Sequence, residues 1–346
     1  MNGIVLKYLA GVADLARLDI EAAAITLRCE DGDIAAGYAG MYARGVRRGQ
    51  GDAPDFSISV NAAQFKTMAS MFDDDDTVVI RRDPEGLVMR SRSSNAQLRA
   101  WGDETDYPEF DRRNAELVAR LPANTLISEI DAAQDFTGES LLRPALTGIR
   151  LDFESPHLLF TATDGFTSLY RASVDATVKG AGSIVVPAAD FALGAKLIGD
   201  GDATIVKPKG ENAVIIYNSH ALFRSSLIAL EWPNLDDVMA TKLGARFQVD
   251  AAQVRNLVAG AKALGSEPDV LVKPQRGYVL FETSSESGGF TTASKGAIDF
   301  EMRFGADVLA KLVKLGSVLS FRAPAVNLKP TLVTSEHRSC WIMMRG

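Results

Sequence analysis

A long-range internal repeat constrains the fold of this chain more than any other feature of its sequence. The segment "VNAAQF" at 60–65 returns as "VPAADF" at 186–191, and the residues that follow stay in step without a gap. Thr77–Arg81 aligns with Ala203–Lys207, and Leu87–Met89 aligns with Ala213–Ile215. A colinear match over about forty residues indicates two copies of one structural unit, whereas a single short match would not.

Each copy reads as the same series of elements. An amphipathic helix is expected at 61–72 and at 187–198, and a polar turn and two strands of alternating polarity follow it. A fainter third copy begins with a helix at 305–315. Its Gly-Ser break and three strands are expected at 316–317, 318–323, 330–335 and 339–344.

The repeat predicts a modular α+β protein. We expect three related domains, at 1–120, 121–245 and 246–346, each with two helices packed on antiparallel sheets of roughly eight strands in all. The tetrapeptide "DAAQ" supports this division, because it occurs at 131–134 and again at 250–253. An Asp N-cap with Gln three residues later is typical of a helix start. We therefore expect helices to begin there, after short strands "LISEI" (126–130) and "RFQV" (246–249).

Composition narrows the classes of function. The chain has 346 residues, 47% of them hydrophobic and 23% charged, and these values are typical of a globular protein with more than one core. No apolar run approaches the roughly 20 residues that a bilayer span requires, so we expect a cytoplasmic protein. The formal net charge is −7, but basic residues outnumber acidic ones in the last third. Cys29 and Cys340 are too far apart in sequence to suggest a metal site or a disulfide framework.

Motifs of catalysis are weak in this sequence. "DDDD" at 73–76 could suggest Mg²⁺, but its repeat partner is the turn Gly199–Asp202, which favours a solvated loop. His157, His220 and His337 fall on separate expected strands and have no nearby nucleophile, and neither GxGxxG nor a P-loop occurs. We therefore expect no metal, no cofactor and no enzymatic activity. A carboxylate–metal enzyme that uses 73–76 is the weaker alternative.

Several longer segments carry a family resemblance. They are "LLRPALTGIRLDF" (141–153), "LLFTATDGFTSLYRASV" (158–174), "GSIVVPAADFALGAKLI" (182–198), "HALFRSSLIALEWPNLDDVM" (220–239) and "CWIMMRG" (340–346). In their order and spacing they resemble the bacterial DNA polymerase III beta subunit, or sliding clamp. The resemblance implies a head-to-tail dimer that closes as a ring of six domains, with helices lining the hole. The first domain is shorter than the family's, because the usual opening strand is nearly absent.

The resemblance also implies a function. A clamp encircles duplex DNA without reading its sequence and tethers a polymerase, so the lining of its hole needs positive charge. The cations on the expected inner helices are Lys7, Arg17, Lys66, Arg143, Lys196, Arg255, Lys262, Lys311 and Lys314. For any one of them, an ordinary solvated helix face is an equally good interpretation.

A second site implied by the family is a groove for short linear peptides of polymerases and the clamp loader. The matching positions are Leu146, Thr163, Gly165, Phe166, Thr167, Pro233, Val238, Ile342, Met343, Met344 and Arg345. A C-terminal core strand is the alternative interpretation of 342–344, and we expect alternate residues there to be buried.

The sequence departs from the family at several of these positions. Phe166-Thr167-Ser168 stands where His-Arg-Leu is usual, Asp237 stands for an Arg, and Met343 stands for a Pro. The departures indicate a divergent clamp, such as one encoded by a phage or plasmid with its own polymerase. A clamp-fold scaffold that binds peptides without encircling DNA is the second hypothesis. We expect the dimer contact to join 94–101 to the region of Leu264.

Overall fold

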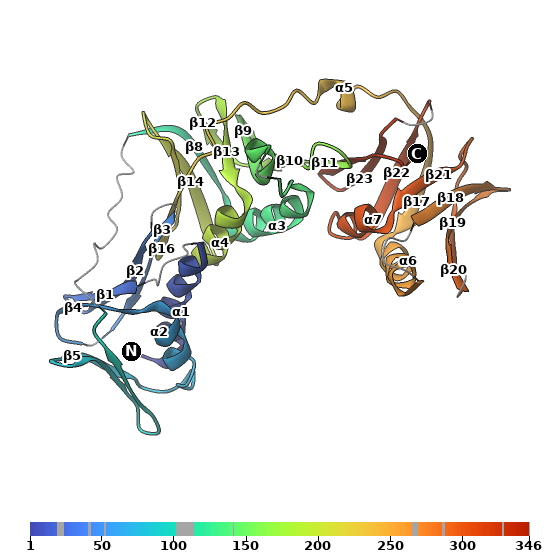
Figure 1. The fold of residues 1–346 in the computed structure, drawn as a ribbon. Coiled ribbons are helices and arrows are strands. Elements are labelled where there is room, and N and C mark those ends of the chain that lie inside the picture. Colours follow the sequence, from blue (N-terminus) through green and yellow to red (C-terminus); the bar gives the residue numbers. More distant parts are fainter. Residues whose placement is uncertain are drawn as a thin grey trace. The chain divides into compact units, whose positions relative to one another are not determined.

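The computed structural model describes residues 1–18, 24–40, 43–51, 53–101, 114–140, 142–264, 269–285, 288–326 and 329–345 (Figure 1). Contacts divide the chain into two compact units. Unit 1 comprises 1–128, 176–182 and 186–228, and unit 2 comprises 129–175, 183–185 and 229–346. The division into three domains at 120 and 245 stays a prediction.

Unit 1 is built on a nine-stranded sheet that contains strands of the first and second repeats. Its order is β12 (Thr177–Lys179), β8 (Ala115–Pro122), β14 (Asp202–Pro208), β15 (Ala213–Tyr217), β16 (Ala221–Ser226), β3 (Ala43–Gln50), β2 (Asp33–Ala39), β1 (Ala24–Glu30) and β4 (Phe56–Asn61). The antiparallel pair β16–β3, with Phe223 opposite Gly45, joins the two repeats. A smaller antiparallel sheet contains β5 (Val79–Asp83), β6 (Gly86–Arg90) and β7 (Asn95–Arg99).

Helices cover the sheets of unit 1 with apolar side chains. They are α1 (Gly3–Ala10), the 3-10 helix η1 (Gly11–Leu18), α2 (Ala62–Ala69) and α4 (Ala188–Ile198). The Asn61 side chain caps α2 by accepting from the Gln64 N–H at 3.0 Å, and Phe65 and Phe191 are fully buried. The predicted helices at 61–72 and 187–198 are thus confirmed, and so are the strands that follow them.

One arginine joins helices of the two repeats. Arg47 on β3 donates to the backbone oxygens of Tyr8 (2.7 Å), Lys196 (2.9 Å) and Leu197 (3.0 Å), near the C-terminal ends of α1 and α4. A cation is favourable at this position because helix C-termini carry unsatisfied carbonyls and partial negative charge.

Unit 2 contains the second joined sheet. Its order is β13 (Gly182–Pro187), β9 (Gly148–Glu154), β10 (His157–Thr163), β11 (Ser168–Asp175), β24 (Arg338–Ile342), β23 (Thr331–Ser335), β22 (Val318–Pro324) and β17 (Leu243–Asp250). The β11–β24 pair places Ser168 opposite Ile342 and joins the middle of the chain to its end. A four-stranded sheet has the order β20 (Gly288–Lys295), β19 (Tyr278–Ser285), β18 (Asp269–Gln275) and β21 (Met302–Gly305).

The helical elements of this half of the chain complete the fold. They are α3 (Ala123–Ala133), η2 (Gln134–Phe136), η3 (Pro144–Thr147), α5 (Asp236–Met239), α6 (Ala251–Leu264) and α7 (Ala306–Leu312). Phe247, Phe281 and Phe321 form an aromatic core cluster, with the rings of Phe247 and Phe321 stacked 5.0 Å apart. The third repeat, with its helix near 305–315 and its three strands, is therefore confirmed in outline.

Two sequence predictions are wrong. His220 and His337, expected on strands, lie in the turns before β16 and β24. The segment 126–130, expected as a strand before a helix starting at 131, lies inside α3, and "DAAQ" at 131–134 ends that helix. Leu126, Ile130 and Ala133 recur at helical spacing and are almost fully buried, so packing of one helix face decides the conformation. The second "DAAQ" behaves as expected, because α6 begins at Ala251.

The fold class is α+β with antiparallel sheets, as the repeat predicts. Ring closure by a second chain stays a prediction. Within the described residues, no helix has the length and apolar character needed to cross a membrane.

Candidate functional site

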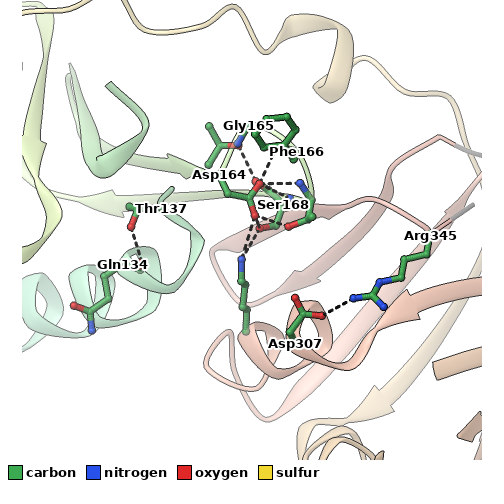
Figure 2. A network of polar contacts seen from close by, with 11 residues as sticks. Gln134, Thr137, Asp164, Gly165, Phe166, Ser168, Asp307 and Arg345 are labelled. Atoms are coloured by element: carbon green, nitrogen blue, oxygen red, sulfur yellow. Dashed lines mark hydrogen bonds and ion pairs between the residues drawn. The ribbon is translucent and has the colours of Figure 1, made fainter. Parts of the chain in front are cut away.

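The turn between β10 and β11 is organised by Asp164. Its Oδ1 accepts the backbone N–H groups of Phe166 (2.9 Å), Thr167 (2.8 Å) and Ser168 (3.1 Å), while Oδ2 accepts both hydroxyls of Thr167 and Ser168 (Figure 2). Burial acts to raise the pKa of Asp164, but these hydrogen bonds outweigh it and lower the pKa to about 2. The carboxylate therefore stays ionised and fixes the turn.

Gly165 is required by the same turn. Its φ is +79°, and an added Cβ would lie 2.7 Å from Leu146 Cδ1. Both facts exclude a larger residue without local rearrangement. An Asp-Gly pair between two strands is typical of a two-residue hairpin turn, but here the turn covers the four residues between Thr163 and Ser168. The hydrogen-bonding role of Asp164 was not predicted from the sequence. The signal for it was a carboxylate before Gly with hydroxyl residues three and four positions later.

A lysine from the third repeat contacts this turn. Lys311 on α7 places Nζ 3.2 Å from Asp164 Oδ2 and 3.1 Å from Ser168 Oγ, and it lies 5.7 Å from the centre of the Phe136 ring. Its side chain is only 20% exposed. Lys311, predicted as a DNA-channel cation, pairs with Asp164 in unit 2 and fixes α7 against the turn, and its channel role stays a prediction.

Apolar side chains are exposed in the turn and in the segment just before η3. Phe166 is 68% exposed and Leu142 is 93% exposed, whereas Leu146 is buried. The Arg143 guanidinium lies 4.7 Å from the centre of the Phe166 ring, a cation–π contact. Arg143, also predicted as a channel cation, thus belongs to the surface around the turn.

The C-terminal segment runs beside the same turn. The Met343 N–H donates to the Thr167 oxygen at 2.8 Å, and Ile342 at the end of β24 is fully buried. Met344 is buried and Met343 is half-buried, so alternate residues do serve the core as expected. The structure thus brings Thr163, Gly165, Phe166, Thr167, Leu146, Ile342 and Met343 together.

Three predicted groove residues contact residues outside this group. Arg345 pairs with Asp269 at 2.7 Å and with Asp307 at 3.5 Å (Figure 2). Val238 belongs to α5, and its N–H donates to the Leu235 oxygen. Pro233 lines a separate cavity, described below.

A buried ionic cluster lies next to the turn, on the face of β11 that Ser168 and Tyr170 share. Glu129 on α3 is 1% exposed and accepts from Arg338 Nη2 (2.5 Å) and Nε (3.0 Å), from the Tyr170 hydroxyl (2.5 Å), and lies 2.8 Å from His337 Nε2. Arg338 also donates to the Lys314 oxygen, so the cluster connects α3, β11 and the segment after α7. Sequence reasoning missed it, because no periodic pattern links positions 129 and 338.

Burial and contacts within this cluster shift the pKa values of Glu129 and Tyr170. Burial acts to raise the pKa of Glu129, but hydrogen bonds from Arg338, Tyr170 and His337 outweigh it and hold the pKa below its usual value. Burial and the neighbouring Glu129 raise the pKa of Tyr170, which keeps its hydroxyl a donor.

The remaining predicted channel cations differ in their partners. Lys7 pairs with Asp74 at 2.6 Å, Lys66 with Asp14 at 2.5 Å, and Lys314 with Asp135 at 2.8 Å. Lys196, Arg255 and Lys262 are exposed on α4 and α6 and form no ion pair with any residue that the structure describes. Arg17 lies in η1, and its side chain is outside the described residues.

Comparisons with known proteins point to one family. Residues 120–234 match the family model described as the DNA polymerase III beta subunit, central domain. No curated protein matches the sequence. Solved structures, however, match along almost the entire chain.

Three of these structures illustrate the likeness. A Pseudomonas aeruginosa sliding clamp bound to griselimycin superposes with a TM-score of 0.86 at 18% identity, covering 100% of this chain and 98% of that one. The beta subunit of Thermotoga maritima gives 0.86 at 12% identity, with the same coverage. A Helicobacter pylori beta clamp bound to a DNA ligase peptide gives 0.81 at 16% identity, covering 99% and 97%.

Proposed function

We propose that this protein is a DNA sliding clamp, because residues 120–234 match the model of the DNA polymerase III beta subunit central domain and the whole chain has the fold of solved sliding clamps. The observation that carries the proposal is the extent of the likeness: 100% of this chain matches 98% of a solved clamp. The protein would act in the cytoplasm as a tether that keeps a polymerase on DNA, and not as a catalyst.

Ring closure supplies the hold on DNA. We infer that two copies associate head to tail and enclose the duplex, so retention depends on topology and not on tight contacts. Lys196, Arg255 and Lys262 are the best phosphate contacts, because they are exposed and form no ion pair with a described carboxylate. Such contacts are independent of sequence and sensitive to salt.

The surface around the Asp164 turn is the proposed peptide groove. Phe166 and Leu142 offer exposed apolar area, and Met343 adds a flexible apolar edge. The complexes of other clamps with a ligase peptide and with griselimycin support a peptide-binding role for this fold. The partners would be short linear segments of the polymerase and of the clamp loader.

A threading experiment tests the clamp proposal without a loader. The protein is incubated with linear duplex DNA that has free ends, the ends are then blocked with streptavidin, and retention is measured in about 0.5 M salt, where phosphate contacts are weak. We expect salt-resistant retention that is lost when a restriction enzyme cuts the blocked DNA. Equal loss from cut and uncut DNA would overturn the proposal.

A clamp-fold scaffold that binds peptides without encircling DNA is the second candidate. It is favoured by one observation: Lys7, Lys66, Lys311 and Lys314 are already paired with carboxylates. The scaffold predicts no threading and, in light scattering, no species at about twice the chain mass of 37.1 kDa.

A further inference from the structure

A cavity in unit 2 has no role in the proposed function. It has a volume of about 400 Å³ and is lined by residues of β9–β11 and of the segment 231–239 that carries α5. The strands contribute Arg150, Asp152, Glu154, Thr161 and Arg171, and the segment contributes Glu231, Trp232, Pro233, Asn234, Leu235, Asp236 and Met239. Its volume is within the range of sites that bind small molecules or single side chains.

Three residues form a row across one wall of the cavity. Thr161 on β10 lies directly opposite Arg150 on β9 and directly opposite Arg171 on β11. Because residues in register on neighbouring strands share a face, two guanidinium groups flank one hydroxyl. This row is a set of hydrogen-bond donors.

The side chains of two members of the row have no oxygen acceptor among the described residues. Thr161 is 7% exposed, and its hydroxyl forms no hydrogen bond with any residue in the described part of the chain. Arg171 donates to the weak acceptor Met239 Sδ at 3.4 Å and pairs with no carboxylate in those same ranges. Arg150, in contrast, binds Asp152 Oδ1 through two nitrogens, at 2.6 and 2.8 Å. Because buried donors without acceptors are costly, the row around Arg171 and Thr161 is suited to an incoming acceptor.

The charges around the cavity select the type of acceptor. Arg171 offers a fork of N–H groups that matches a carboxylate or a phosphate. Glu154, Glu231 and Asp236 are exposed lining residues, and they repel a doubly charged phosphate more strongly than a singly charged carboxylate. Trp232 and Leu235 provide an apolar surface that suits a short carbon stem.

We propose that this cavity binds the side-chain carboxylate of a glutamate or aspartate in a partner protein segment, through Arg171 and Thr161, with Trp232 against its stem. Where the partner is the peptide of the proposed groove, the inference rests on the proposed function, because Pro233 was predicted for that groove and lines the cavity. The carboxylate site would then hold an acidic residue that flanks the apolar part of the peptide.

The test uses a blocked glutamate as the probe. The protein is labelled with 5-fluorotryptophan, which places one fluorine on each of its three tryptophans, and the resonance of Trp232 is assigned with Trp232→Phe. N-acetyl-glutamate methylamide is titrated into the millimolar range, alongside the isosteric N-acetyl-glutamine methylamide and inorganic phosphate. We expect a saturable shift of the Trp232 resonance with the glutamate probe. The glutamine probe should bind at least tenfold more weakly because it lacks the charge that pairs with Arg171. Phosphate should also bind at least tenfold more weakly because the acidic lining residues repel its larger charge.

Two variants and a control locate the binding. Arg171→Gln is expected to weaken binding of the glutamate probe at least tenfold. Thr161→Val keeps the shape of the side chain but removes its hydroxyl, and it should weaken binding about fivefold. Arg322→Gln removes an exposed arginine from β22 of the same sheet and is expected to change nothing. Far-ultraviolet circular dichroism of each variant checks that it is folded.

Three results would overturn the inference: no shift of Trp232 with any probe, equal binding of the glutamate and glutamine probes, or equal binding of phosphate. Probe binding requires neither DNA nor a second copy of the chain. A failed probe titration therefore leaves the clamp proposal intact, and a failed threading experiment leaves the carboxylate site intact.

Discussion

Replacing Glu129 by Gln tests whether the buried ionic cluster stabilises unit 2. The substitution keeps the shape of the side chain but removes its charge, so the Arg338 guanidinium, in a residue only 8% exposed, loses its counter-ion. The new amide also turns an NH₂ group toward donors such as the Tyr170 hydroxyl. Breaking a buried ion pair by removing one partner costs about 3–5 kcal/mol.

An exposed pair provides the matched control. Glu116 lies 2.6 Å from Lys207, but its side chain is 51% exposed. Glu116→Gln makes the same chemical change where solvent screens the charges, so we expect a loss of about 0–1 kcal/mol. The difference between the two variants isolates the effect of burial.

Urea unfolding provides the measurement. In a Trp101→Phe background, the fluorescence of Trp232 and Trp341 follows unit 2, which contains Glu129. In a background with Trp232→Phe and Trp341→Phe, the fluorescence of Trp101 follows unit 1, which contains Glu116. We expect Glu129→Gln to lower the free energy of unfolding by about 3–5 kcal/mol relative to its parent. Equal losses of unfolding free energy for the Glu129 and Glu116 variants, each measured against its own parent, would refute this expectation.

The sign of the pH dependence follows from the lowered pKa of Glu129. A group whose pKa is lower in the folded state contributes stability above its unfolded pKa, about 4.3 for Glu, and loses it as pH falls through the folded value. The gap in stability between the parent and Glu129→Gln should therefore be constant at neutral pH and narrow only below about pH 4.

Three further predictions concern the surfaces of the proposed clamp. Lys196→Glu with Lys262→Glu should lower DNA retention in the threading assay and leave the dimer in light scattering unchanged; undiminished retention at matched salt would count against their channel role. Gly165→Ala should cost about 1–3 kcal/mol in urea unfolding, because its φ is +79° and its Cβ would approach Leu146 to 2.7 Å; an unchanged midpoint would contradict this. Phe166→Ala should change stability by no more than about 1 kcal/mol, the value of an exposed cation–π contact. It should nevertheless weaken the binding of a polymerase-derived peptide, measured by fluorescence anisotropy. Unaltered peptide affinity would exclude Phe166 from the groove.

Local pattern predicted much of the fold. The repeat predicted α2, α4 and α7 and the strands after them, because the periodic spacing of buried apolar residues in a helix or strand can be recognised from residues close together in the sequence. The segment 126–130 was misjudged for the same reason. A five-residue window of mixed polarity fits a strand or a helix, and the buried helix face of α3 becomes visible only over its full length.

Long-range charge pairing could not be predicted in the same way. Lys311 was assigned to DNA from its place on an amphipathic helix, but its partner Asp164 lies 147 residues away in the sequence. Glu129 and Arg338 are separated still further, by 209 residues. Partners so distant are brought together by the β11–β24 pairing, and a single sequence carries no local trace of that pairing.

Cryo-electron microscopy of the protein threaded on an end-blocked duplex tests the central claim most directly. We expect two chains closed head to tail around the DNA, with α4 and α6 facing the phosphates. A single chain, or a duplex bound on the outer face of a sheet with no closed ring, would contradict it.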